Sequence, residues 1–172
     1  MTPRQALPGK GLKTMWSMEI LAVGAVLLTG LVALAIIDVR TLRLPDWLTL
    51  PMIPAGLFSA WWLGDSVLWH AAGAAIGYAC FVALETAYKA LRGRDGLGRG
   101  DAKLLAVGGA WCGALLLPVI ILVASSVGLI LMLALHLLAV RDINGATQLP
   151  FGPFLALGIA VAWFLLRSGL WM

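Results

Sequence analysis

Five long stretches without a charged residue distinguish this 172-residue sequence from those of soluble proteins. Four of them, at 20–37, 47–64, 66–84 and 149–166, have 18 or 19 residues, and the fifth, at 104–140, has 37. A transmembrane helix needs about 20 apolar residues, and a helix satisfies its own backbone hydrogen bonds in lipid. The whole chain is only 12% charged, against roughly 25% in a typical soluble domain. We therefore predict an all-α, polytopic integral membrane protein.

The longest stretch is predicted to contain two helices. As a single helix its 37 residues would extend about 55 Å, well beyond the bilayer core. Pro118 has no backbone N–H to donate inside a helix, so we place a break near Leu117–Pro118. This gives a short helix over about 101–116 and a full one that ends at Val140. About six transmembrane helices then form one membrane domain between two tails, with boundaries predicted at 1–19 for the first tail, 20–168 for the domain and 169–172 for the second tail.

The basic residues predict which side of the membrane each loop faces. With six spans, the loops at 38–46, 85–103 and 141–148 lie on one side and carry eight of the 12 Lys and Arg residues. Cytoplasmic loops of membrane proteins are enriched in Lys and Arg. We therefore expect these three loops to face the cytoplasm.

The remaining composition excludes several other classes of protein. The net charge is +4, but the cationic residues are sparse and form no stripe that would follow nucleic acid phosphates, so no nucleic acid partner is expected. Cys80 and Cys112 form no C-x-x-C pair, so neither a zinc site nor a disulfide framework is predicted. We interpret both cysteines as small core residues, and His70 and His136 as packed side chains in apolar helices. No metal ion or cofactor is expected.

Two of the eight acidic residues have no evident structural role. A charge at the centre of a membrane helix costs roughly 2.5–3.5 kcal/mol, so each acid needs a reason to be there. Asp46 and Asp65 directly precede or open apolar stretches and are predicted to be N-caps, although Asp46 is also a candidate secondary site residue. Asp38, in contrast, ends an apolar stretch, and Asp101 follows a segment with three glycines in five residues.

The six-helix topology places Asp38 and Asp101 at the same depth on the same side, although 63 residues separate them. From the residues alone, a shared site and two separate helix-end roles are both open. Two carboxyl groups a few Å apart titrate as a unit, with one protonated while the other is charged. The charged group would deprotonate a water that attacks a peptide carbonyl, and the protonated group would protonate the departing amine.

Four segments, in the same order along the chain, resemble those of the type IV prepilin peptidases. Residues 37–51, IDVRTLRLPDWLTLP, resemble the first signature, an Asp followed by a short polar loop and L-P-D/N-x-L-T-L-P. Residues 96–105, GLGRGDAKLL, are similar to the second signature, G-x-G-D-x-K. Residues 108–113 and 149–156, GGAWCG and LPFGPFLA, are similar to two further segments of that family.

This resemblance implies a GxGD-type aspartic endopeptidase in the bacterial inner membrane, with its active site at the cytoplasmic side. Its substrates would be type IV prepilins or the pseudopilins of type II secretion, which lose a short basic leader and keep an apolar helix in the membrane. By the same resemblance, Asp38 and Asp101 are the catalytic pair. Gly98, Gly100 and Lys103 would support the catalytic loop, and the Lys103 cation would stabilise the charged form of one acid.

Longer members of that family carry an N-terminal cytoplasmic domain with two C-x-x-C pairs, and they also methylate the new N-terminus with S-adenosylmethionine. Here 19 residues precede the first apolar stretch, and both cysteines lie within apolar stretches. We therefore expect a short form without the zinc and methyltransferase domain, and we do not expect N-methyltransferase activity.

Two alternative functions use the same pair of acids. A presenilin-like intramembrane protease shares the G-x-G-D element, but it has a Tyr-Asp pattern where this chain has Ile37–Asp38. A proton-coupled membrane transporter would use Asp38 and Asp101 as proton carriers. Such transporters commonly contain inverted repeats, and no repeat is recognisable in this sequence.

Overall fold

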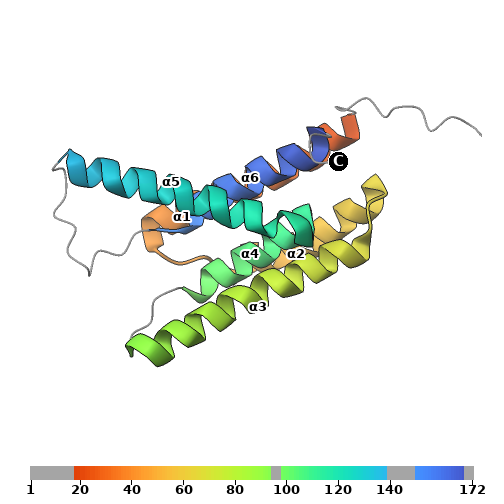
Figure 1. Ribbon diagram of the computed structural model, residues 1–172. Coiled ribbons are helices and arrows are strands. Elements are labelled where there is room, and N and C mark those ends of the chain that lie inside the picture. The colour runs from red at the N-terminus through yellow and green to blue at the C-terminus, as the bar shows by residue number, and fades with distance from the viewer. Residues whose placement is uncertain (1–17, 94–97, 139–149, 169–172) are drawn as a thin grey trace, which may run out of the picture.

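The computed structural model describes residues 18–93, 98–138 and 150–168, and these ranges contain no strand. They form six α-helices and one 3₁₀ turn (Figure 1), in the chain order α1 (Met18–Thr41), α2 (Asp46–Leu63), α3 (Val67–Arg92), α4 (Arg99–Cys112), η1 (Ala114–Leu116), α5 (Leu117–Leu137) and α6 (Gly152–Ser168). The two predicted tails lie outside the described residues, except that Met18 and Glu19 begin α1. The predicted loop at 141–148 lies outside them entirely.

The predicted fold class is confirmed. Within the described ranges, three helical segments, Met18–Thr41, Val67–Leu91 and Ala114–Leu135, are long and apolar enough to cross a bilayer, and Gly152–Ser168 is a shorter apolar helix. Large apolar side chains on these helices are exposed, for example Leu129 on α5, and such a surface suits lipid rather than water. The chain is therefore an all-α membrane protein, while the exact count of six spans stays a prediction.

The break within the longest apolar stretch lies at Gly113, four residues before the predicted break at Leu117–Pro118. Gly113 has a φ of +80°, a backbone conformation that favours glycine, and it ends α4 at Cys112. η1 follows, and α5 begins at Leu117. Pro118 therefore lies in the first turn of α5, where a backbone N–H would have no hydrogen-bond acceptor within the helix. A proline at this position costs the helix no hydrogen bond. The second helix therefore begins where it was predicted to begin, whereas the first helix ends four residues earlier than predicted, because Gly113 ends it and not the proline.

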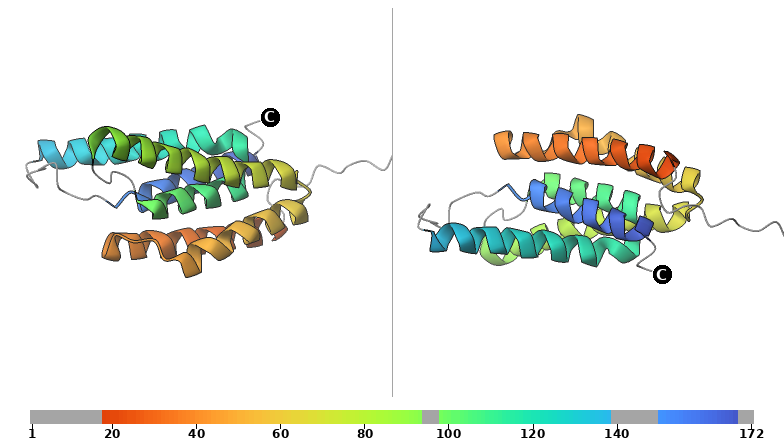
Figure 2. Two further views of the ribbon diagram at one scale, coloured as in Figure 1. Left: turned by 90° about the horizontal axis from the view of Figure 1, so that it is seen from below. Right: turned by 90° about the horizontal axis from the view of Figure 1, so that it is seen from above.

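The six described helices pack in three layers (Figure 2). α1 and α2 form one outer layer, α3 and α5 form the other, and α4 and α6 lie between them. α4 has only 14 residues, and every residue from Ala102 to Cys112 except Lys103 is buried. A helix of this length rises about 21 Å, less than the roughly 30 Å of a bilayer core. The short α4 is accommodated because α2, α3 and α6 pack around it.

Glycine residues bring α4 into direct backbone contact with α3. A Cβ atom added at Gly109 would lie 2.2 Å from the backbone carbonyl of Gly73, and one added at Gly77 would lie 2.8 Å from the carbonyl oxygen of Leu105. Small residues four apart allow membrane helices to approach each other this closely. The contact fixes the position of α4 and, with it, the residues of its first turn.

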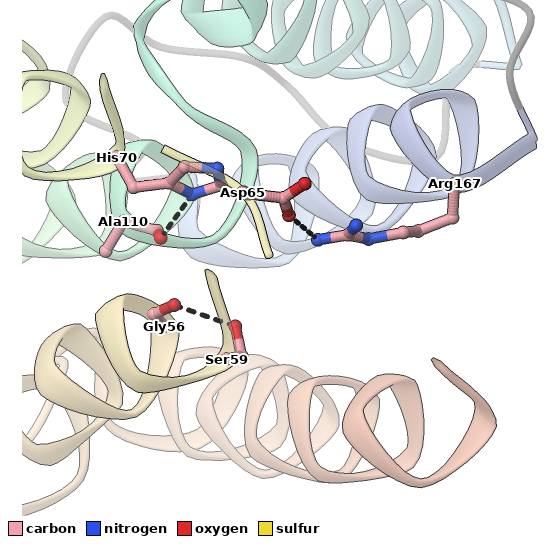
Figure 3. Close-up of polar contacts among 6 residues, drawn as sticks. All are labelled: Gly56, Ser59, Asp65, His70, Ala110 and Arg167. Atoms are coloured by element: carbon pink, nitrogen blue, oxygen red, sulfur yellow. Dashed lines mark hydrogen bonds and ion pairs between the residues drawn. The ribbon is translucent and has the colours of Figure 1, made fainter. Parts of the chain in front are cut away.

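An ion pair connects α6 to the turn between α2 and α3 (Figure 3). Asp65 in this turn pairs with Arg167 in the last turn of α6. The Arg167 side chain is only 9% exposed, and its Nε has no hydrogen-bond partner among the described residues. The prediction that Asp65 caps the following helix is wrong, because Ser66 is the N-cap residue of α3 and makes no side-chain cap hydrogen bond.

The interpretation of His70 as a packed side chain is confirmed. Its ring is buried, and Nδ1 lies 2.9 Å from the carbonyl oxygen of Ala110 in α4 (Figure 3). Cys112 is buried as predicted, whereas Cys80 is exposed and is therefore not a core residue. Apolar sequence alone did not separate these two cysteines, because side chains that face lipid are as apolar as those that face the core. The side chain of His136 lies outside the described part of the structure.

Candidate active site

Asp38 and Asp101 lie at the same end of the helix bundle. Asp38 is in the last turn of α1, and Asp101 is in the first turn of α4. The end of α1 and the starts of α2, α4 and α6 gather at this end (Figure 1). The negative charge of Asp38 acts on the carboxyl group of Asp101, so residues that are 63 positions apart in sequence are neighbours in space.

The first turn of α6 holds the carboxylate of Asp38. The residue is 5% exposed, and its Oδ2 accepts a 2.9 Å hydrogen bond from the backbone N–H of Gly152, the first residue of α6. Backbone N–H groups in a first helical turn have no partner within their helix, and they form the positive end of the helix dipole. Asp38 lies at the C-terminal end of α1, where the helix dipole is negative and disfavours a carboxylate. The positive end of α6 offsets this effect and stabilises the charge.

Glycine at position 152 leaves room for this contact. A Cβ atom added at Gly152 would lie 2.6 Å from Oδ2 of Asp38 and 2.9 Å from its Cγ. Sequence analysis identified residues 149–156 only as a segment similar to a family segment and gave Gly152 no role. The available signal was the Gly-Pro pair near the start of an apolar stretch, since Pro153 suits the first turn of a helix. That signal indicates where the helix starts, and it does not indicate what its N–H groups bind.

The glycines of the second motif position Asp101 at the start of α4. Gly98 is the N-cap residue, and Asp101 lies three residues later, with its Oδ2 3.6 Å from where a Cβ atom at Gly98 would be. The Asp101 N–H in turn donates to the Gly98 carbonyl oxygen at 3.0 Å. Gly100 allows Leu44 to approach closely, because a Cβ atom added there would lie 3.0 Å from the Cβ of Leu44. The loop between α1 and α2 therefore packs against the first turn of α4.

Lys103 forms an ion pair with Asp46, with Nζ 2.5 Å from Oδ1. Asp46 is the first residue of α2, and the N-cap position belongs to Pro45, so the prediction that Asp46 caps the helix is wrong. The pair connects the beginnings of α2 and α4 beside Asp101, and its side chains are 58% exposed for Asp46 and 25% exposed for Lys103. Lys103 was predicted to stabilise one of the catalytic acids, but its ammonium group pairs with Asp46 instead. This ion pair links α2 and α4.

Comparison with known proteins identifies the family. Residues 25–133 match the type IV leader peptidase family. The chain belongs to this family. The matched segment runs from α1 into α5 and includes both Asp38 and Asp101. The family resemblance inferred from the four sequence segments is therefore confirmed.

Several curated proteins are similar to this member of the type IV leader peptidase family. The prepilin leader peptidase/N-methyltransferase of Aeromonas salmonicida is 44% identical over 147 residues, that of Pseudomonas aeruginosa is 40% identical over 148, and that of Dickeya chrysanthemi is 38% identical over 164. The matches cover 81% to 91% of this chain and 48% to 56% of the relatives, so the chain spans about half the length of the curated relatives it matches. No solved structure matches the chain.

The site of this leader peptidase family member brings together two carboxyl groups in different surroundings. Asp38 is buried against the first turn of α6, whereas Asp101 is half-buried at the start of α4. Interacting carboxyl groups share protons as a unit, so the arrangement can supply one acid and one base. No group of three or more His, Cys, Asp or Glu side chains within the described ranges is arranged to hold a metal ion.

Proposed function

We propose that this chain is an aspartic endopeptidase of the bacterial inner membrane that removes the short basic leader of type IV prepilins or pseudopilins at the cytoplasmic face. The observation that carries the proposal is the meeting of Asp38 and Asp101, from α1 and α4, at one end of the bundle. Membership of the type IV leader peptidase family supports it, as do relatives whose names state that they act on prepilins.

In the proposed reaction, Asp38 is the base and Asp101 is the acid. The Gly152 N–H and the positive end of α6 stabilise ionised Asp38. Burial of Asp101 and, second, the negative charge of Asp38 favour a proton on Asp101. Asp38 takes a proton from a water, whose oxygen bonds to the carbon of the scissile carbonyl. Asp101 hydrogen-bonds to the carbonyl oxygen and then gives its proton to the nitrogen as the C–N bond breaks. The products are a leader with a new carboxyl group and a mature protein with a free amine.

The distribution of basic residues supports the cytoplasmic face. The described basic residues at the Asp38 end include Arg40 in the last turn of α1, Arg43 between α1 and α2, and Arg99 and Lys103 near the start of α4. Arg167 lies at the opposite end of the bundle. Cytoplasmic segments are the ones enriched in Lys and Arg. A substrate with an apolar helix in the membrane and a basic leader in the cytoplasm would place its scissile bond near the depth of the two acids.

Family membership favours the peptidase over a proton-coupled transporter that would use the same two acids as proton carriers. The names of the relatives also include an N-methyltransferase, and the chain spans about half of their length. Our expectation that this chain does not methylate the new N-terminus stays a prediction. Incubation of the cleaved product with labelled S-adenosylmethionine tests it, and we expect no label on the mature N-terminus.

Co-expression with a candidate prepilin, followed by N-terminal sequencing of the product, tests the peptidase proposal. We expect the wild-type chain to release a mature N-terminus just after the basic leader. Asp38→Asn and Asp101→Asn should each reduce cleavage by about 10²–10⁴-fold, the usual contribution of one acid–base group.

A matched control separates catalysis from general effects of acid-to-amide changes. Glu19 is an exposed acid in the first turn of α1, at the end opposite Asp38, so Glu19→Gln should process the prepilin like the wild type. Correct membrane insertion of both aspartate variants would show that they fold. Near-normal processing by Asp38→Asn or by Asp101→Asn would rule out the catalytic assignment.

A further inference from the structure

We propose that a groove between α1 and α6 binds the apolar helix of the prepilin substrate; this inference rests on the proposed function. The groove has a volume of about 550 Å³ and lies towards the start of α1 and the end of α6. Its walls include Leu21, Ala25 and Leu28 from α1, and Ala160 and Phe164 from α6. No charged side chain lines it, so the surface suits an apolar segment that stays in the membrane.

The groove is built by the two helices that also form the Asp38 end of the site. α1 and α6 pack against each other, and at the end remote from the groove the Gly152 N–H of α6 donates to Asp38 of α1. A substrate helix that lies along both helices therefore extends towards the end of the bundle that holds Asp38. This helix runs parallel to α6, because its first residue follows the scissile bond and its chain then continues away from the cytoplasm.

Small side chains in the groove allow a helix backbone to approach closely. Gly24 and Ala25 on α1 and Ala160 on α6 are among the lining residues, and Ala25 is exposed. Membrane helices associate through small residues of this kind, since close approach increases van der Waals contact where water provides no hydrophobic driving force. The ring of Trp163 packs against Gly24 and forms the floor between the two walls.

The distance from the groove to Asp38 predicts which substrate residues bind there. Leu28 precedes Asp38 by 10 residues and Leu21 precedes it by 17, which places the groove about 15–26 Å from Asp38 along α1. A substrate helix that begins at the scissile bond has the same rise per residue. It would therefore bring roughly its residues 10 to 17 into the groove, still within a bilayer core of about 30 Å.

Filling the groove tests whether the substrate helix binds there. The variants are Ala25→Leu alone and Ala25→Leu together with Ala160→Leu, each compared with the wild type. Each enzyme is tested on the full prepilin and on a shortened prepilin, which ends about eight residues after the scissile bond and so does not reach the groove. We expect KM for the full prepilin to rise about tenfold, the scale of one important interface contact, with kcat little changed. KM for the shortened prepilin should not change. Ala75→Leu, a matched change at an exposed position of α3 in the opposite outer layer, should change neither.

The possible results distinguish this inference from the proposed function. No cleavage of any prepilin by the wild type would remove the proposed function. Normal cleavage with an unchanged KM for the full prepilin, or an equal rise in KM for both substrates, would overturn the groove assignment and leave the peptidase intact. The result with exposed Ala25→Leu alone is decisive if the double variant fails to fold.

Cysteine cross-linking tests the register independently. Leu28→Cys or Leu21→Cys is introduced into a Cys80→Ser chain that also carries Asp101→Asn to keep the prepilin uncleaved, and single cysteines are scanned along the substrate helix. We expect the strongest cross-link near substrate residue 10 for Leu28→Cys and near residue 17 for Leu21→Cys, about two helical turns further on. Cross-links only between two copies of this chain, no cross-link at all, or a position that does not shift between the two variants would show that another copy or lipid occupies the groove.

Discussion

The backbone N–H of Gly152 donates a 2.9 Å hydrogen bond to Oδ2 of Asp38, across 114 positions in the sequence. The contact joins the last turn of α1 to the first turn of α6. The buried carboxylate thereby gains a hydrogen bond from an N–H group that has no acceptor within its own helix. It fixes the orientation of the Asp38 side chain beside Asp101. The geometry of the proposed catalytic pair therefore depends on a residue that carries no side chain.

Gly152→Ala should reduce catalysis while the bundle remains folded. The new Cβ atom would lie 2.6 Å from Oδ2 of Asp38, so the carboxylate has to move or the start of α6 has to shift. A misplacement of about 1 Å in a reacting group commonly costs about 10²-fold in rate, and we expect a loss of that size in kcat/KM for prepilin cleavage. Purified wild-type and variant enzymes are compared on the same prepilin.

Gly128→Ala is the matched control for that variant. Gly128 lies in α5, and a Cβ atom added there would lie 3.4 Å from the Phe154 ring, which is ordinary van der Waals contact. We expect wild-type activity and thermal stability from it. Full activity of Gly152→Ala would show that the orientation of Asp38 does not depend on α6.

Asp46→Asn should have only a small effect on cleavage. The Asp46–Lys103 pair is substantially exposed, and pairs of this kind contribute about 0–1 kcal/mol, so a loss of less than about fivefold is expected. Asparagine also keeps an oxygen that accepts a hydrogen bond from Lys103. Exchange of the two charges, Asp46→Lys with Lys103→Asp, should recover more activity than Lys103→Asp alone. A loss of about 10²-fold or more in Asp46→Asn, in steady-state kinetics, would instead place Asp46 in the chemistry.

The positions of the helices could be predicted because lipid imposes simple requirements on the sequence. The charge-free stretch at 47–64 corresponds to α2 within one residue at each end, and the stretch at 20–37 lies within α1. The stretch at 66–84 underestimates α3, which continues to Arg92. Charged residues such as Glu85 end an apolar stretch, but a helix continues past them wherever its backbone leaves the hydrocarbon region.

The contacts around the two aspartates could not be predicted in the same way. Local rules assigned Asp46 and Asp65 to helix caps, whereas both form ion pairs with residues that are 57 and 102 positions away, Lys103 and Arg167. Such partners depend on which helices pack together, and helix periodicity and capping rules do not specify this. The motif that contains Asp38 could be recognised because its residues are consecutive, while its hydrogen bond to Gly152 exists only in the folded chain.

Gly109→Ala should destabilise the whole bundle. The added Cβ atom would lie 2.2 Å from the backbone of Gly73, and backbone atoms cannot move aside as a flexible side chain can, so α3 and α4 have to separate. Overpacking of this kind costs about 1–3 kcal/mol, and the midpoint of thermal unfolding in detergent should fall accordingly. Activity should fall as well, because α4 carries Asp101. An unchanged unfolding midpoint would mean that the two helices are not in direct backbone contact in the membrane protein.

Removing Asp65 from the Asp65–Arg167 ion pair should destabilise the protein more than removing Arg167. Arg167 is 9% exposed and Asp65 is 30% exposed, so Asp65→Ala leaves a buried cation without a partner, whereas Arg167→Met leaves a carboxylate that water can still reach. Removing one partner of a buried pair costs up to about 3–5 kcal/mol, and we expect Asp65→Ala to approach this range and Arg167→Met to fall below it. The double variant should be more stable than Asp65→Ala alone, because the unpaired cation is gone. Unfolding of all three variants in detergent measures this, and equal losses in the two single variants would mean that the Arg167 cation is hydrated and not enclosed by the bundle.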